Sequence, residues 1–215
     1  MHMFQLFRKP KIIPKDQMFR NAFSKHIPET AVDYVMSLWT EHPFYFKVAR
    51  SRKTCLGNYM FKNGSHHISV NGDSNAYSFL ITLIHEIAHQ RVQIQQSLFK
   101  RKPSPHGETW KREFSRLMSP LLKPNVFPED ILEVLIPHMQ DPAASSVKDP
   151  NLVKVLAKYS PQSEGIYLSD LKDGEEFLFK GRRFKRIAQR RTRILVECVN
   201  SKKRYTIPGI AHVKP

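Results

Sequence analysis

The chain has 215 residues, of which 40% are hydrophobic and 25% are charged, so it is long enough to bury a core and has the composition of a globular protein. No run approaches the ~20 apolar residues of a membrane helix, and the short apolar N-terminus lacks the core and cleavage site of a signal peptide. Two cysteines exclude a disulfide framework and a four-cysteine zinc site. We therefore expect a cytoplasmic protein without a membrane segment, nucleoid-associated if the source is bacterial.

The net charge of +16 indicates an anionic partner, most often nucleic acid. Residues 180–215 hold twelve lysines and arginines and one acid, Glu197. A surface that is basic for solubility alone would spread its cations along the chain. The concentration at the C-terminus predicts a separate basic module instead.

Apolar residues at helical spacing predict helices at 16–25, after Pro28, at 76–99, from Gly107, at 129–139 and at 151–159. The start of the 76–99 helix is apolar nearly all round, which is typical of a helix in the core. Alternating apolar residues predict strands at 44–49, 57–62 and 66–70. Asn63-Gly64 is a strong hairpin turn between the last two.

After about Gly165 the pattern changes to short strands, predicted at 176–180, 183–189, 193–199 and 203–207. The sequence therefore predicts an α+β protein in three parts. Residues 1–140 form a domain of helices plus a small antiparallel sheet, residues 141–164 a linker with a short helix, and residues 165–215 a small basic all-β module.

The segment His85-Glu86-Ile87-Ala88-His89 lies within the predicted core helix. Its two histidines are one helical turn apart and point the same way, so they can bind one Zn²⁺ together. Glu86 lies about 100° round the helix, where it can reach a water on the metal without being a ligand. Burying these groups without a partner is unfavourable, so a metal site explains them better than a plain core.

A catalytic zinc site needs a third protein ligand and an open position. His106 is the best candidate, because it follows the helix breaker Pro103-Ser104-Pro105 and is separated from His89 by sixteen residues. That gap lets the chain end one helix and return. Glu113 is the nearest acid that could replace it, and we expect Glu113 to face solvent.

The sequence resembles the SprT family, which includes the Spartan-type DNA-dependent metalloproteases. The resemblance rests on His85–His89, on His106-Gly107-Glu108-Thr109-Trp110, and on a basic segment at 50–54 followed by strands that end at Asn71. It covers about residues 30–120. It implies a zincin-like catalytic domain that cleaves protein, with Zn²⁺ on His85, His89 and His106 and with Glu86 as general base.

Many members of that family carry a cysteine zinc ribbon after the protease core, whereas Cys198 is the only cysteine in that region here. We expect the basic module to bind DNA without metal, as single strands or through the backbone phosphates. The candidate contacts are Arg182, Arg183, Lys185, Arg186, Arg190, Arg191 and Arg193. Phe179, Phe184 and Tyr205 can stack on bases, although a place in the module's own core is favoured for the two phenylalanines.

The combined prediction is a zinc endopeptidase that cleaves protein bound to or near DNA. One alternative is a nucleic-acid-binding protein with a structural or vestigial zinc site. Another is a zinc peptidase whose basic module binds a membrane or an acidic protein. The sequence leaves open which of Tyr59, His66 and His67 is an additional oxyanion donor. It also leaves the oligomeric state open. The remaining histidines, His26, His42, His138 and His212, show no ligand pattern.

Overall fold

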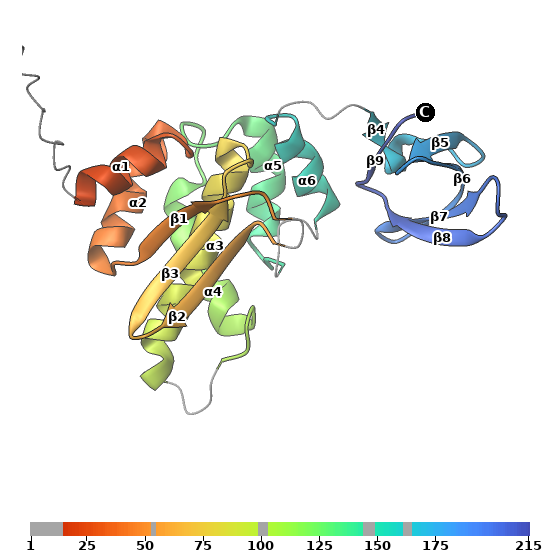
Figure 1. Ribbon diagram of the computed structural model, residues 1–215. Helices are drawn as coiled ribbons and strands as arrows, with labels where there is room; N and C mark the ends of the chain where they lie inside the picture. Colours follow the sequence, from red (N-terminus) through yellow and green to blue (C-terminus); the bar gives the residue numbers. More distant parts are fainter. Residues whose placement is uncertain (1–14, 53–54, 99–102, 144–148, 161–164) are drawn as a thin grey trace, which may run out of the picture.

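The computed structural model describes residues 15–52, 55–98, 103–143, 149–160 and 165–215 (Figure 1). The first part of this described chain contains helices and one small sheet. The helices are α1 (Lys15–Ser24), α2 (Glu29–Glu41), α3 (Ala76–Ile94), α4 (Glu108–Met118), α5 (Glu129–His138) and α6 (Pro150–Ala157). The strands are β1 (Tyr45–Ala49), β2 (Gly57–Lys62) and β3 (Ser65–Asn71). The predicted α+β class is correct.

The sheet has the strand order β1-β3-β2. β2 and β3 form the predicted hairpin, and its turn residues Asn63 and Gly64 both have positive φ values, 51° and 73°, as a two-residue turn of the primed type requires. The prediction of a wholly antiparallel sheet is wrong, because β1 pairs with β3 in parallel. The chain reverses between Ala49 and Gly57 and takes β2 to the outer edge, so that β3 returns between the other two strands.

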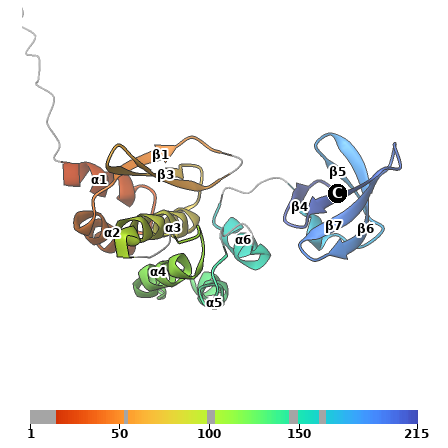
Figure 2. The same ribbon diagram turned by 90° about the horizontal axis from the view of Figure 1, so that it is seen from below.

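Helix α3 is the centre of the domain and lies between the sheet and α4 (Figure 2). Asn75 caps it by accepting a hydrogen bond from the backbone N–H of Ser78 at 2.9 Å. Apolar side chains cover most of its circumference, as predicted for a core helix; the fully buried ones are Phe79, Leu80, Leu83, Ile84, Ile87 and Ala88. The metal-ligand segment is therefore part of the least exposed element of the fold.

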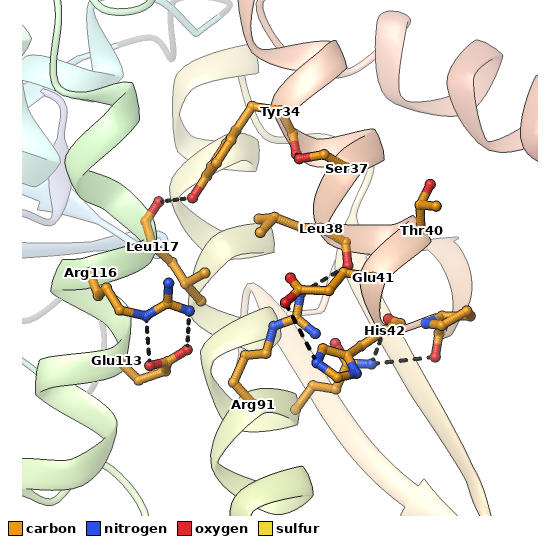
Figure 3. A network of polar contacts seen from close by, with 12 residues as sticks. Tyr34, Ser37, Leu38, Thr40, Glu41, His42, Arg91, Glu113, Arg116 and Leu117 are labelled. Carbon is orange, nitrogen blue, oxygen red and sulfur yellow. Dashed lines mark hydrogen bonds and ion pairs between the residues drawn. The ribbon is translucent and has the colours of Figure 1, made fainter.

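A network of polar contacts joins α2, α3 and α4 (Figure 3). Buried Arg91 of α3 donates to the carbonyl oxygen of Leu38 at 2.9 Å and to a carboxylate oxygen of Glu41 at 3.0 Å. Glu113 of α4 is buried as well, and both its oxygens accept from Arg116, at 2.7 and 3.0 Å. The expectation that Glu113 faces solvent is wrong. Its charge acts on Arg91, where it opposes the lowering of the pKa that burial of the guanidinium causes.

Helix α6 is the short helix predicted within the linker segment, and it packs on α5. Its side chains Leu152, Val155 and Leu156 belong to the same apolar core as those of α3 and α4. Residues 150–157 are therefore part of the first folded unit. In the part of the chain that the structure describes, no helix is both long and apolar enough to span a bilayer.

The described residues after Gly165 contain strands and one short 3₁₀ helix, Leu168–Asp170. The strands are β4 (Ile166–Tyr167), β5 (Glu176–Phe179), β6 (Arg182–Arg190), β7 (Arg193–Cys198), β8 (Arg204–Pro208) and β9 (His212–Val213). Strands β5-β6-β7-β8 form an antiparallel sheet, and β4 pairs with β9. A second apolar core contains Phe177, Phe184, Ile194 and Val196, with Phe179 packed against it. The core position favoured for Phe179 and Phe184 is confirmed.

Candidate metal centre

Three imidazoles converge at one point. His85 and His89 extend from one face of α3, and His106 reaches them from the segment that precedes α4. The Nε2 atoms of His85 and His89 are 3.2 Å apart, those of His89 and His106 are 2.9 Å apart, and those of His106 and His85 are 3.2 Å apart. The fold thus brings together the three residues that the sequence predicts as metal ligands.

The backbone before α4 explains how His106 reaches the site. His106 has a φ of 59°, in the left-handed region that few non-glycine residues adopt. Gly107 follows, and its N–H donates to the carbonyl oxygen of Ser104 at 3.0 Å. A Cβ at Gly107 would lie 2.3 Å from the Ser104 hydroxyl oxygen, so any larger residue requires that hydroxyl to rotate away. The strained turn directs the His106 ring back toward α3, and strain of this kind is common at functional sites.

Trp110, on the first turns of α4, packs beneath the three imidazoles. Its ring centroid lies 4.6 Å from that of His85, 4.7 Å from that of His106 and 5.4 Å from that of His89. The residue is 1% exposed and therefore belongs to the core. The same contacts fix the orientation of the three rings.

The donor set fits a divalent cation. Burial, with the neighbouring imidazoles adding to it, lowers the pKa of His85 to about 3 and that of His89 to about 4. Both rings are therefore neutral at pH 7, which is the form that binds metal. Zn–N bonds of ~2.0–2.1 Å in a tetrahedral site hold their donors ~3.3 Å apart. Three facing nitrogens cannot all pair as donor and acceptor, whereas one cation satisfies them together.

Glu86 lies beside this cluster, outside the group of potential ligands, which in the described chain consists of the three histidines. Its carboxylate packs against β2, where a Cβ at Gly57 would lie 2.5 Å from the Glu86 Oε1 atom. Burial raises the pKa of Glu86 to about 8, while the charge of Arg52 and a hydrogen bond from the Tyr59 backbone act in the opposite direction. Gly57 therefore leaves the space that Glu86 occupies.

A cleft of about 460 Å³ opens over the cluster. Its walls come from β2, α3, the segment before α4, α4 itself and the end of α5; they include Gly57, Asn58, Tyr59, Glu86, Pro105, Phe114 and His138. Of the three oxyanion donors left open by the sequence, Tyr59 lines this cleft. Its hydroxyl is 2.9 Å from Nδ1 of His66, and its ring stacks on His89. His67 instead stacks on Tyr45, with centroids 4.9 Å apart.

His138 and Gly57 are the two residues of the site that sequence reasoning missed. The side chain of His138 is 5% exposed, and its Nδ1 lies 2.9 Å from a carboxylate oxygen of Asp149. No local pattern marks either residue. Each acquires its role from a contact with a distant segment.

The predicted nucleic-acid contacts do not form one uniform surface. Arg186 is buried and paired with Asp173. Arg182 lies over the rings of Phe184 and Tyr205, 5.5 and 5.3 Å from their centroids. The remaining five side chains are exposed; they are Arg183 and Lys185 on β6, and Arg190, Arg191 and Arg193 at the β6–β7 hairpin.

Comparison of the chain with models of protein families, with curated proteins and with solved structures gave no match.

Proposed function

We propose that this chain is a zinc-dependent endopeptidase of the SprT-like type that acts on protein bound to or near DNA. The observation that carries the proposal is the convergence of three imidazole nitrogens beside a buried carboxylate in one cleft. His85, His89 and His106 would hold the metal. Glu86 would act as general base.

Zn²⁺ bound there would supply a Lewis acid for the scissile carbonyl and would acidify a water molecule. The three neutral ligands leave the full charge of the cation in place. Glu86 takes the proton of the attacking water and passes it to the leaving amine.

The position of β2 favours an extended peptide as substrate. β2 is an edge strand that pairs with β3, and its residues Gly57, Asn58 and Tyr59 form one wall of the cleft. An extended chain can add to such an edge through main-chain hydrogen bonds. That mode of binding requires a polypeptide rather than a small molecule.

The alternative of a purely structural zinc site is less well supported. Structural zinc is usually closed by four protein ligands, whereas the potential ligand group in the described residues has three members. A buried carboxylate that stands outside this group has no use in a structural site. The five exposed cations of β6 and β7 support the DNA part of the proposal through phosphate contacts.

The test is a comparison of the wild type with Glu86→Gln, both loaded with Zn²⁺. We expect about one zinc per chain in each protein and a loss of casein or self-cleavage in the variant of about 10²–10⁴-fold. Single-stranded DNA should stimulate the wild type. Glu133→Gln, at an exposed position on α5, is the matched control and should cleave normally. A wild type without bound zinc, or a Glu86→Gln variant of unchanged activity, would contradict the proposal.

A further inference from the structure

His138, the last residue of α5, forms part of the wall of the cleft that contains the three imidazoles and Glu86. The site as proposed above gives it no role. Its side chain is 5% exposed although it borders a cavity of about 460 Å³. A nearly buried imidazole at the rim of a hydrolytic cleft can touch a bound substrate.

Asp149 fixes the ring of His138. One carboxylate oxygen of Asp149 accepts from the backbone N–H groups of Asn151 and Leu152, at 3.0 and 3.2 Å, and so caps α6. The other oxygen lies 2.9 Å from Nδ1 of His138. Since a carboxylate accepts, Nδ1 carries a proton in this contact. Nε2, on the opposite side of the ring, is directed away from Asp149.

The end of α5 is also tied to α4. The Ser115 hydroxyl donates to the carbonyl oxygen of Met139 at 2.8 Å, and Lys111 pairs with Asp141 at 2.6 Å. Phe114 of α4 lines the cleft as well, and its ring meets that of His85 with centroids 5.5 Å apart. One helix therefore supports both the metal-ligand cluster and the residue next to His138.

We propose that His138, positioned by Asp149, donates a hydrogen bond through Nε2 to the substrate carbonyl oxygen as negative charge develops on it. This rests on the proposed hydrolytic function and adds an electrophilic donor to it. No proton is transferred in the step, because Glu86 carries the proton from water to the amine. Because Nδ1 already holds a proton toward Asp149, the donor is the ring with a proton on each nitrogen, and the Asp149 carboxylate, 2.9 Å from Nδ1, faces the charge of that ring as in an Asp-His pair. Tyr59 suits this role less well, because its hydroxyl is engaged with His66.

A merely structural role would need Nδ1 alone, as a bridge between α5 and α6. Two substitutions separate the roles. His138→Asn places an amide nitrogen near the position of Nδ1, so it keeps the contact with Asp149 and removes the atom that reaches the substrate. His138→Gln places its amide nitrogen near the position of Nε2.

The experiment measures kcat, KM and the melting temperature of the zinc-loaded full chain with each variant. We expect His138→Asn to melt like the wild type, to lose about 10²–10³-fold in kcat, and to keep KM within a few-fold. His138→Gln should lose less than His138→Asn. A wild type that cleaves, together with a His138→Asn variant of equal kcat, would overturn the inference and leave the proposed function intact.

A second readout does not depend on turnover. A peptide phosphonate, whose anionic oxygens mimic the tetrahedral intermediate, is titrated into zinc-loaded wild type and His138→Asn. We expect the variant to bind it at least tenfold more weakly, and the ring ¹⁵N signals of His138 in the wild type to shift on binding. Equal affinity overturns the inference even if the wild type cleaves no test protein. Absence of phosphonate binding by the wild type overturns it together with the proposed metal site.

Discussion

The two folded parts of this chain differ in the burial of their charged side chains: the first buries several, and the second exposes nearly all of its own. The part that contains α3 buries Glu86, Arg91 and Glu113. Arg91 pairs with Glu41 through Nη2, although its Nε and Nη1 have no hydrogen-bond partner, and Glu113 pairs with Arg116. Among the described residues after Gly165, Arg186 is the one buried charged side chain, and its other cations face solvent. The first part has a core of more than thirty side chains, whereas the second core has nine. Only a large core can hold several desolvated polar groups in fixed positions.

The difference agrees with the proposed function, in which the first part performs the chemistry and the second provides a charged binding surface. Buried, partnered groups have fixed geometry and shifted pKa values, both of which catalysis needs. Exposed arginines gain little from fixed geometry and suffice for contacts with phosphates. Substitutions in one part should therefore leave the function of the other unchanged.

Removal of a metal ligand should give the largest effect. We expect His106→Ala to weaken Zn²⁺ binding by more than ~10²-fold, because loss of a residue that only supports a ligand already weakens binding by up to ~10²-fold. Competition with a chelator measures this affinity. DNA affinity should stay within twofold of the wild type. His67→Ala is the control and should retain zinc. An equal loss of DNA affinity in His106→Ala would break the proposed independence of the two parts.

A methyl group at position 57 should have the next largest effect. A Cβ there would lie 2.5 Å from Oε1 and 2.9 Å from Cγ of Glu86, so Gly57→Ala must displace the carboxylate. A misplacement of ~1 Å can lower the rate by ~10²-fold, and we expect such a loss in kcat with zinc content unchanged. Gly209→Ala, in the second part, meets its nearest atom at 3.5 Å and should cleave normally. Wild-type activity in Gly57→Ala would refute the close packing of Glu86 on β2.

The histidines should make the metal-free protein sensitive to acid. The pKa of His85 falls from 6.5 to about 3 on folding, so its contribution to stability is complete above pH 6.5 and is lost as the pH falls toward 3. Glu86 acts in the opposite sense, because its pKa rises from 4.5 to about 8 and its contribution is lost as the pH rises through that range. The measurement is therefore made in the Glu86→Gln background.

In that background, the protein that keeps His85 should lose about 2 kcal/mol more of its unfolding free energy between pH 7 and pH 5 than the His85→Gln variant. Urea unfolding of the metal-free proteins at the two pH values gives this difference directly. Equal losses of unfolding free energy in the two proteins would contradict this prediction. The second part of the chain has no comparable buried histidine among its described residues, so its unfolding should change less.

The arginines of the β6–β7 hairpin should give the smallest effect. We expect Arg190, Arg191 and Arg193, changed together to alanine, to weaken binding of single-stranded DNA about tenfold at moderate salt. The slope of log K against log salt should fall by about 2, or ~0.7 for each cation. Cleavage of a substrate in the absence of DNA and zinc content should not change. Lys62→Ala, in the first part, is the control. An unchanged salt dependence in the triple variant would exclude this hairpin from the DNA surface.

The sequence predicted what depends on local pattern. The period of apolar residues located α3, and Asn63-Gly64 located the hairpin, because both signals are complete within a few residues. The spacing of His85, His89 and His106 was sufficient to identify the three rings that meet. A glycine and an aromatic residue just after His106 belong to the same local pattern.

What the sequence could not predict depends on contacts between distant segments. The parallel pairing of β1 with β3 follows from the path of the chain around β2. Glu113 is buried on α4, and its charge acts on buried Arg91 of the neighbouring helix α3. His138 gains its place from Asp149 and from the docking of α5 on α4. None of these partners can be chosen from spacing alone.

The absence of a side chain at Gly57 also limits the register in which β2 can pair with β3. Sliding β2 by one residue against β3 would bring Leu56 or Asn58 over the Glu86 carboxylate, and neither leaves room for it. The register of an edge strand is often weakly specified. Here the close fit of Gly57 against Glu86, on the helix beneath, fixes it. We expect insertion of one residue into the Asn63-Gly64 turn to displace the Glu86 carboxylate without altering any residue of the cleft.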